Sequence, residues 1–471
     1  MLKTTLKYDN GTIIISGIGH IPYSIYDSRS GVFRAQALYY QNILDYLKQS
    51  ELSYEDRVLD LIPSPQIKTD SRLEHQNRVS LRDYQTHALE NWLRAKKRGC
   101  VVLPTGSGKT IIGIKALEKV NASSLVVVPT IDLMDQWTSV LTKFFAYSNA
   151  IKIGNLGGGS DNIEMITVST YDSAYLRAAS FGNRFALVIF DEVHHLAAPG
   201  YRLIAEQLAS PFRLGLTATI EREDDLHKEL PRLVGGVVYQ VHPRDLAKNR
   251  HLAMYELERR EVDMKPEEVE EYKKWIGIYQ SGLKKVGLRM AYAGAFQKLI
   301  MMSSRNKVAR ETLLARSRAI EIALNSKSKL EELRKILEQN KGRKTIIFTQ
   351  HNKLVYDIAD RFLIPFITYK SGKDERKDAL SGFKEGRYKA IVTSKVLDEG
   401  VDVPDAEVGI IVSGTGSSRE FIQRLGRLLR PKADSNNKAT LIEIISANTR
   451  EIGTSTKRKR ALSKDIDNEY S

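Results

Sequence analysis

The stretch LPTGSGKT at residues 103–110 decides the fold of this chain. A short apolar run from Cys100 to Leu103 leads into it, and a helical pattern from Ile111 to Leu117 follows it. A glycine-rich turn between a strand and a helix is the setting of a phosphate-binding loop, because the backbone N–H groups at the start of a helix point toward a bound anion. The stretch therefore predicts a nucleotide site in an α/β domain with a largely parallel sheet.

The residue types of this loop suggest a role for each position. The backbone N–H groups of Gly106, Ser107 and Gly108 are expected to face the phosphates. Lys109 is expected to reach the β- and γ-phosphates, and the Thr110 hydroxyl is expected to bind Mg²⁺.

A second motif supports the first, which has Leu103 where the strict pattern asks for glycine. FDEVHHL at residues 190–196 is a buried-strand run that ends in two carboxylates, Asp191 and Glu192. Asp191 can hold the Mg²⁺ shell, and Glu192 can position or deprotonate the attacking water. An acidic turn after a core strand is the alternative interpretation, which the pairing with the loop disfavours. The two motifs together predict hydrolysis of a nucleoside triphosphate.

The composition limits the possible protein classes. A chain of 471 residues is long enough for two or three domains. Its single cysteine, Cys100, excludes a disulfide framework and is expected to pack in a core strand. The near absence of cysteine favours an intracellular location, which is cytoplasmic or, in a eukaryote, nuclear. Signal-peptide and membrane-spanning patterns are not found in the sequence. The net charge of +15 favours a polyanionic partner.

Strand and helix patterns predict six segments along the chain. We expect an N-terminal α+β domain at 1–70, a linker at 71–80, α/β domains at 81–250 and 326–450, a helical insertion at 251–325 and a basic polar tail at 451–471. The expected strands of the α/β domains are 100–103, 124–128, 165–169, 186–190 and 212–216, then 344–350, 390–394, 408–413 and 439–445. In the helix expected at 329–340, Glu331 and Lys335 have the spacing of an ion pair.

The helical insertion is strongly basic. Residues 269–320 contain eleven Lys and Arg against three Asp and Glu, a balance of +8. A solvated face of a helical linker and an arm that lies on nucleic acid are both possible, and the charge favours the arm. The candidate phosphate contacts are Lys284, Lys285 and Arg289. The helices are expected to be interrupted at Gly277, Gly282, Gly287 and Gly294.

The second α/β domain has no phosphate loop but contains QRLGRLLRP at 423–431. Its helical pattern places Arg427 and Arg430 on one face. We expect these arginines to stabilise the charge of the transition state, and Gln423 to help position the γ-phosphate or the water. An ordinary basic helix face is the alternative.

Five motifs in this order resemble the superfamily 2 helicases and translocases, a family with two RecA-like domains that bind ATP. They are PTGSGKT, DEVH, TAT at 217–219, TSKVLDEGVDVP at 393–404 and QRLGRLLR. The resemblance explains Leu103, because the family's loop does not require glycine there. It implies that Gln85 reads the adenine with support from Arg82.

The same resemblance implies further roles. Nucleotide binding would also involve Pro104, Thr105 and Asp402. The residues that would couple nucleotide state to domain movement are His194, Thr217, Thr219, Asp398 and Gly400. The segments 127–137, 169–174 and 348–352 would touch one nucleic-acid strand.

A closer resemblance is to the XPB family of repair helicases, and to its archaeal members in particular. LTATIEREDD at 216–225 contains Arg222, Glu223 and Asp224, which match the RED motif and are candidate nucleic-acid contacts. The basic insertion is similar to the family's thumb, and the N-terminal domain, with YDSRSG at 26–31, resembles its damage-recognition domain.

This resemblance implies an ATP- and Mg²⁺-dependent DNA helicase or translocase of 3'–5' polarity. Forked or damaged duplex DNA would be its substrate in nucleotide excision repair, with transcription as a second expected process and a nuclease as a partner protein. The alternatives are an RNA helicase, the translocase subunit of a restriction system, and a binding module whose ATP site has decayed.

Overall fold

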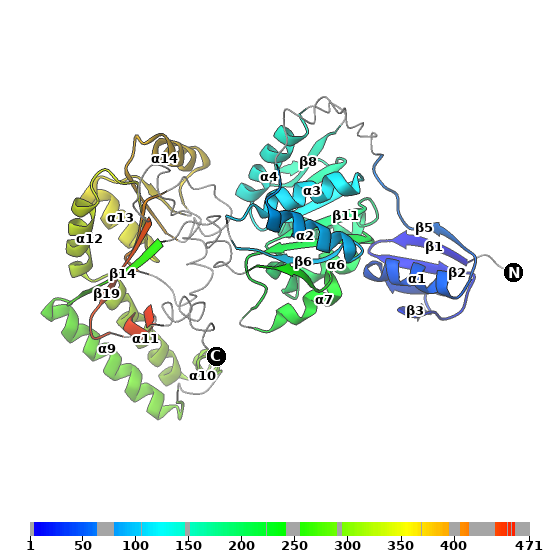
Figure 1. The fold of residues 1–471 in the computed structure, drawn as a ribbon. Coiled ribbons are helices and arrows are strands. Elements are labelled where there is room, and N and C mark those ends of the chain that lie inside the picture. Colours follow the sequence, from blue (N-terminus) through cyan, green and yellow to red (C-terminus); the bar gives the residue numbers. More distant parts are fainter. Residues whose placement is uncertain are drawn as a thin grey trace, which may run out of the picture. The chain divides into compact units, whose positions relative to one another are not determined.

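In the computed structural model the chain divides into two compact units (Figure 1). The first comprises residues 1–252 with 399–402, and the second comprises residues 253–398 with 403–471. The described residues are 4–63, 80–104, 106–146, 151–222, 224–241, 255–289, 294–368, 370–394, 406–413, 439–449, 451–453 and 455–456. None of the helices in these ranges is both long enough and apolar enough to cross a membrane.

The first unit begins with a small α+β domain, as expected. Its five-stranded sheet has the order β3-β4-β2-β1-β5. The elements are β1 (Thr4–Asp9), β2 (Thr12–Ser16), β3 (Ser24–Asp27), β4 (Val32–Gln36), η1 (Ala37–Tyr39), α1 (Tyr40–Gln49) and β5 (Tyr54–Arg57). Helix α1 forms because Ile43, Leu44 and Leu47 recur on one face, and that face is buried in the core of this domain.

Tyr8 on β1 anchors the α+β domain to the α/β domain that follows it. The Tyr8 hydroxyl lies 2.8 Å from Ala179 O and 3.0 Å from Gln207 O, both of which are acceptors in the α/β domain. Gly182 leaves room for this hydroxyl, because a Cβ there would lie 2.2 Å from it. Burial raises the pKa of Tyr8 to about 12, so the phenol stays protonated at neutral pH and keeps its proton for these acceptors.

The α/β domain of the first unit is built on an eight-stranded sheet of order β13-β6-β12-β11-β7-β10-β8-β9. All its pairings are parallel except that of the short β9 with β8. Separate apolar cores cover the sheet, one with α2, α3 and α4 and the other with α5, α6 and α7. The strands are β6 (Arg98–Val102), β7 (Ser124–Val128), β8 (Ile153–Gly157), β9 (Ser160–Asp161), β10 (Ile166–Thr170), β11 (Leu187–Asp191), β12 (Phe212–Thr217) and β13 (Val237–Gln240). The helices are α2 (Asp83–Arg94), α3 (Lys109–Val120), α4 (Ile131–Phe144), α5 (Tyr171–Phe181), η2 (Val193–Ala197), α6 (Arg202–Gln207), η3 (Leu226–Glu229) and α7 (Leu230–Leu233).

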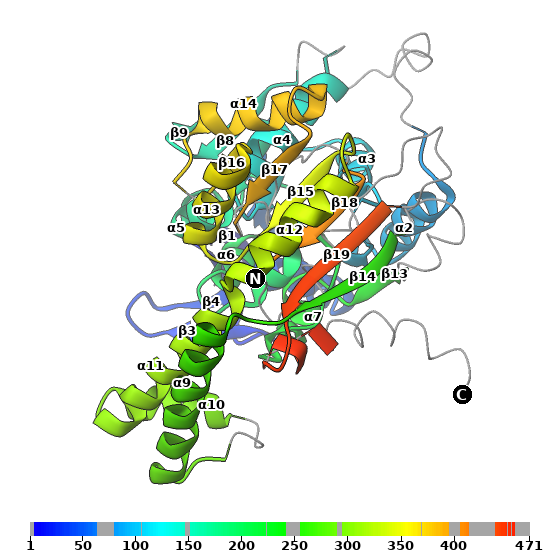
Figure 2. The ribbon, with the colours of Figure 1, turned by 90° about the vertical axis from the view of Figure 1, so that its left-hand side faces the viewer.

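The second unit contains a six-stranded parallel sheet of order β14-β19-β18-β15-β17-β16 (Figure 2). Helices α12 and α13 pack on this sheet through a shared apolar core. The strands are β14 (Tyr255–Val262), β15 (Thr345–Phe348), β16 (Phe366–Ile367), β17 (Ala390–Thr393), β18 (Val408–Ile411) and β19 (Ala439–Ser446). The helices beside the sheet are α12 (Lys327–Gln339), α13 (Asn352–Phe362) and α14 (Lys373–Glu385).

Three helices of the second unit project from its sheet and form what we call the basic arm (Figure 2). They are α9 (Pro266–Lys285), α10 (Ala295–Ser303) and α11 (Lys307–Leu324). Two of the four predicted glycine breaks are wrong, because α9 continues through Gly277 and Gly282. Gly282 is instead a packing site: a Cβ there would lie 2.0 Å from the Thr312 hydroxyl on α11. Gly287 and Gly294 do have positive φ and flank the connection between α9 and α10.

Every strand expected in the two α/β domains is present, and the parallel sheets confirm the predicted fold class. Five strands of these domains were not predicted from the sequence: β8, β9, β13, β14 and β16, of which β9 and β16 have only two residues each. Strand β14 has the sequence YELERREV and lies at the edge of its sheet, where its charged residues obscure the strand pattern. The expected pair of Glu331 and Lys335 is also wrong, because Glu331 Oε1 lies 3.1 Å from Lys265 Nζ and Lys335 Nζ lies 3.2 Å from Glu332 Oε2.

Candidate nucleotide site

The phosphate loop lies where the sequence predicts it, between β6 and α3. Gly106 and Gly108 have φ values of 77° and 78°, a left-handed conformation that glycine adopts without strain. Gly108 is the residue that precedes α3, so the loop turns directly into the helix N-terminus. Lys109 begins the helix, is 7% exposed, and donates from Nζ to Leu103 O at 3.2 Å. This bond holds the lysine against its own loop.

Helix α2 fixes the phosphate loop from the side. Gln85 Nε2 and the Tyr84 hydroxyl both donate to Ser107 O, at 2.7 Å and 2.8 Å. Gln85 Oε1 in turn accepts from the backbone N–H of Arg82 at 2.9 Å, and the Arg82 guanidinium donates to the Tyr84 hydroxyl at 3.2 Å. Gly108 is required here as well, since a Cβ at this position would lie 2.6 Å from Gln85 Nε2. The predicted pair of Arg82 and Gln85 is therefore brought to the loop, and its contact with adenine stays a prediction.

The carboxylate motif meets the loop at the carboxyl edge of the sheet. Strands β6, β12 and β11 are neighbours, and their register pairs Thr217 with Val102 and Leu216 with Asp191. Ligand sites of parallel sheets form at this edge. Asp191 is 6% exposed at the end of β11, and its Oδ1 accepts from the backbone N–H of Glu192 at 3.0 Å.

Glu192 has a left-handed backbone with φ of 46°, which is costly for a residue with a Cβ. Its Oε2 lies 3.3 Å from the Thr217 hydroxyl. The same hydroxyl lies 2.7 Å from Thr219 O, accepts from Thr219 N at 3.2 Å, and lies 3.1 Å from His194 Nδ1. Four residues of two predicted motifs therefore form one cluster around the buried Thr217.

The residues of this site fit an Mg²⁺–nucleotide complex. Among the described residues, the buried Ser107 hydroxyl has no protein partner, and it stands in the loop where a phosphate oxygen would accept its proton. Thr110 and Asp191 offer hydroxyl and carboxylate oxygens, the donor types that Mg²⁺ prefers. Pro104 is buried at the start of the loop.

Arg222 and Asp224 of the predicted RED motif bind each other. Arg222 Nε and Nη2 donate to the two carboxylate oxygens of Asp224 at 2.9 Å and 2.7 Å, and Arg222 Nη1 donates to His194 O at 2.9 Å. The hydrogen bond from Arg222 lowers the pKa of Asp224 to about 2. The motif is thereby tied to the carboxylate motif through His194, and its contact with nucleic acid stays a prediction.

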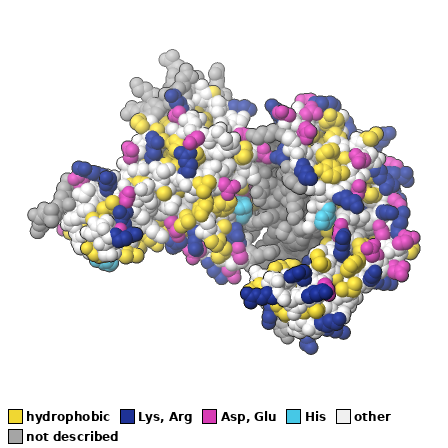
Figure 3. Space-filling view, turned by 180° about the vertical axis from the view of Figure 1, so that it is seen from behind, with side chains coloured by type: hydrophobic (Ala, Val, Ile, Leu, Met, Phe, Trp, Pro, Cys, Tyr) yellow, Lys and Arg dark blue, Asp and Glu magenta, His cyan; other side chains and the backbone are white. Residues whose placement is uncertain are grey.

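The candidate contacts of the basic arm are exposed. Lys284 and Lys285 lie in the last turn of α9, and Arg289 follows the turn at Gly287. Figure 3 shows Lys and Arg side chains spread over the arm, with hydrophobic side chains among them. The arm therefore presents positive charge to solvent, which the sequence predicted.

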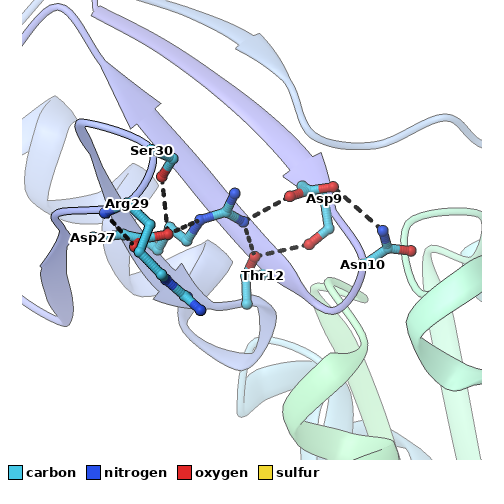
Figure 4. Close-up of a pocket in the computed structure, with 7 residues that line it drawn as sticks. Asp9, Asn10, Thr12, Asp27, Arg29 and Ser30 are labelled. Atoms are coloured by element: carbon cyan, nitrogen blue, oxygen red, sulfur yellow. Dashed lines mark hydrogen bonds and ion pairs between the residues drawn. The ribbon is translucent and has the colours of Figure 1, made fainter.

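A polar pocket lies on the N-terminal α+β domain, where the YDSRSG segment turns between β3 and β4 (Figure 4). Arg34 bridges Asp9 and Asp27, with Nη1 2.6 Å from Asp9 Oδ2 and Nε 3.1 Å from Asp27 Oδ2. Asp27 also accepts from the Arg29 guanidinium at 3.0 Å and from the Ser30 hydroxyl at 2.9 Å. These hydrogen bonds, of which the one from Arg29 has the largest effect, lower the pKa of Asp27 to about 2. The segment is therefore held by an ionised aspartate.

Several predicted site residues lie outside the described part of the chain. They are Thr105, Glu223, Asp398, Gly400, Asp402, Gln423, Arg427 and Arg430.

Three aromatic side chains of the site were not among the predicted site residues. Trp137 Nε1 donates to Asp191 Oδ2 at 2.8 Å, the Tyr171 hydroxyl donates to Asp191 O at 3.1 Å, and Tyr84 binds the loop. Trp137 and Tyr171 belong to segments that the resemblance assigns to a nucleic-acid strand, yet both are 1% exposed. Tyr84 lies between the predicted residues Arg82 and Gln85, and this position next to Gln85 was the only sequence signal for its role.

Profiles of three families match the chain. Residues 6–58 match the Xeroderma pigmentosum group B helicase damage recognition domain. Residues 78–222 match the Type III restriction enzyme, res subunit, and residues 315–471 match the ERCC3/RAD25/XPB C-terminal helicase. Two of the three descriptions therefore name XPB.

Individual proteins agree with these profiles. The chain is 41% identical to the DNA 3'-5' translocase XPB2 of Sulfurisphaera tokodaii, over 96% of this chain and 99% of that protein. It is 28% identical to the general transcription and DNA repair factor IIH helicase/translocase subunit XPB/SSL2 of Saccharomyces cerevisiae, over 91% of this chain and 47% of that protein. The chain thus spans nearly all of the first relative and about half the length of the second. The Hef helicase domain of Pyrococcus furiosus has a similar fold, with a TM-score of 0.53 and 19% identity over 80% of this chain and 98% of that chain. The chain therefore belongs to the XPB family of DNA helicases and translocases.

Proposed function

We propose that this protein hydrolyses ATP with Mg²⁺ and uses the reaction to translocate on DNA with 3'–5' polarity and to open its strands. The observation that carries the proposal is the cluster of Glu192, Thr217 and His194. It adjoins the strand end that bears Asp191, and Thr217 ends a strand that pairs with β6, the strand that leads into the phosphate loop. The left-handed backbone of Glu192 costs free energy, and such strain is typical of active sites. It therefore disfavours the alternative of a decayed ATP site.

The chain's own residues divide the work of hydrolysis. Lys109 and the N–H groups at the start of α3 bind the phosphate oxygens. Thr110 and Asp191 would hold Mg²⁺, which when bound neutralises charge on the phosphates. Glu192 orients the attacking water and accepts its proton, while the Thr217 hydroxyl keeps the Glu192 carboxylate in position.

DNA is the proposed substrate because the relatives named above are a DNA translocase and a subunit of a DNA repair factor. The exposed lysines of the basic arm suit the phosphate backbone, which gives affinity without sequence preference. The N-terminal α+β domain, which matches a damage recognition domain, is proposed to bring the protein to lesions in nucleotide excision repair. Transcription is a second proposed process, on the strength of the yeast relative's name.

The test is the ATPase rate with single-stranded, duplex and forked DNA and with the same panel in RNA. Glu192→Gln serves as the control for contaminating activity. We expect stimulation by DNA above RNA, and displacement of strands from forks with 3' tails. Equal stimulation by RNA would favour the RNA helicase alternative, and ATPase without movement or strand displacement would contradict the proposed helicase.

A nuclease partner is also proposed, on the resemblance to archaeal XPB proteins alone. Affinity purification of the full chain from its source cells, followed by a nuclease assay on forked DNA, tests it. Co-purified nuclease activity that depends on the chain is expected, and its absence under conditions where ATPase survives would contradict the proposal.

A further inference from the structure

Two buried tryptophans of the first unit donate their indole N–H to different kinds of acceptor. Trp92 on α2 is 0% exposed and donates to the backbone carbonyl of Arg213 at 2.9 Å. Trp137 on α4 is 1% exposed and donates to Asp191 Oδ2 at 2.8 Å. Only the second acceptor belongs to a residue that would hold the metal.

Both oxygens of the Asp191 carboxylate are thereby oriented. Oδ1 accepts from the backbone N–H of Glu192, and Oδ2 accepts from Trp137. Each carboxylate oxygen has two lone-pair sites, so a donor on each fixes the plane of the group and leaves capacity for a cation. Without the indole N–H, the carboxylate could rotate about its Cβ–Cγ bond, which is a soft torsion.

The space for Trp137 is built into the phosphate-loop helix. A Cβ on Gly113 of α3 would lie 2.6 Å from Trp137 Cη2. The indole therefore packs directly against α3, the helix that begins with Lys109 and Thr110. Its position is set by this contact, and the N–H is aimed at Asp191 from a fixed ring.

We propose that Trp137 is a positioning residue of the ATPase, whose indole N–H holds the Asp191 carboxylate in the orientation that binds Mg²⁺. The inference rests on the proposed function, because it assigns Asp191 to the metal. Outer partners of metal ligands commonly contribute about 10- to 100-fold in metal affinity or activity.

The test measures Mg²⁺ binding without turnover. Equilibrium dialysis with radiolabelled ATPγS, in EDTA and in saturating Mg²⁺, gives the gain in nucleotide affinity that Mg²⁺ produces. In Trp137→Phe this gain should fall by about 10- to 100-fold, while affinity in EDTA stays within a few-fold of the parent. Trp92→Phe is the matched control: it also removes a buried indole N–H and should keep the full gain. Asp191→Asn removes the proposed metal ligand itself and shows how small the affinity gain from Mg²⁺ becomes when that ligand is lost.

A second variant separates the hydrogen bond from the packing. Trp137→3-benzothienylalanine keeps the shape of the two rings but replaces the N–H with sulfur, and it should lose the Mg²⁺ gain as Trp137→Phe does. A full Mg²⁺ gain in the benzothienyl protein overturns the inference, whatever the stability of Trp137→Phe. If Mg²⁺ does not raise the ATPγS affinity of the parent protein, both the proposed function and the inference are wrong. If Mg²⁺ raises the affinity of the parent and of both Trp137 variants equally, only the inference is wrong.

Discussion

In the nucleotide site Lys109, Asp191 and His194 are buried and hydrogen-bonded, whereas the three candidate DNA contacts of the basic arm are exposed to solvent. Lys109, Asp191 and His194 are between 6% and 8% exposed, and each has a fixed neighbour in the loop or the sheet. Lys284, Lys285 and Arg289 are exposed at one end of α9. A buried group acts on one atom of its ligand, so its exact position matters. An exposed cation acts through water on a diffuse charge, so the number of cations matters more.

The two regions also differ in how their backbone is built. The site sits on strand ends of a sheet with a large core on each face, and it tolerates a left-handed Glu192. The arm is held by two small clusters in which alanine is the commonest buried residue, and by close contact at Gly282. We therefore expect single substitutions to abolish activity in the site and to act in graded steps on the arm.

The largest effect is expected for Glu192→Gln, which removes the proton acceptor and keeps the shape of the side chain. Turnover should fall by roughly 10²- to 10⁴-fold, with nucleotide affinity little changed. The measurement is steady-state ATPase together with equilibrium binding of ATPγS. Glu206→Gln is the control, since it makes the same change at a buried carboxylate of this domain that pairs with Arg232 at 2.6 Å. Near-parental turnover in Glu192→Gln would refute the role assigned to Glu192.

A smaller loss is expected for Thr217→Val, which keeps the volume but removes the hydroxyl at the centre of the cluster. Unpaired buried partners cost about 1–3 kcal/mol, so ATPase should fall by roughly 5- to 150-fold. Thr219→Val is the comparison, because the described bonds of Thr219 run through its backbone N and O. A larger loss in Thr219→Val than in Thr217→Val would contradict the cluster as the source of the effect.

On the arm, the triple change Lys284→Ala, Lys285→Ala and Arg289→Ala should weaken DNA binding to a similar degree for all sequences. The log–log dependence of affinity on salt should flatten by about one unit per lost phosphate contact, and DNA-independent ATPase should survive. Forked DNA is titrated at several salt concentrations.

The control for this charge change removes the same number of exposed positive charges, three, from the second α/β domain. It carries Lys341→Ala, Lys377→Ala and Lys384→Ala, all at exposed positions. A salt slope that changes equally in both triple variants would assign the effect to total charge and remove the special role of the arm.

The smallest effects concern the packing of the arm. Gly282→Ala places a Cβ 2.0 Å from the Thr312 hydroxyl and should destabilise the contact of α9 with α11 by about 1–3 kcal/mol. Gly277→Ala lies in the same helix with no atom within 4 Å of the added Cβ, and should stabilise it by about 0.5–1 kcal/mol. Amide hydrogen exchange across α9 and α11 measures both. Faster exchange in Gly277→Ala than in Gly282→Ala would mean that the close contact is not a constraint.

Local sequence was sufficient wherever one short segment builds the feature alone. LPTGSGKT encodes its own turn through Gly106 and Gly108, and Asp191 follows a strand whose every residue is apolar up to that point. For this reason the phosphate loop, the carboxylate motif and the strands β6, β7, β10, β11 and β12 around them could be predicted. The polar edge strand β14 could not, because its partner β19 lies far away in the chain and supplies the hydrogen bonds that stabilise it.

The sequence by itself determined the α/β class, the nucleotide motifs and the positive charge of the arm, since composition and short spacings encode these directly. Only the tertiary structure decided which distant groups meet: Trp137 with Asp191, Tyr84 with Ser107, and Tyr8 with Gln207. Such pairs depend on strand order and register, which bring together residues 23 to 199 positions apart in the chain. A side chain's own neighbours do not encode that order, because it follows from the burial of whole strands and helices against one another.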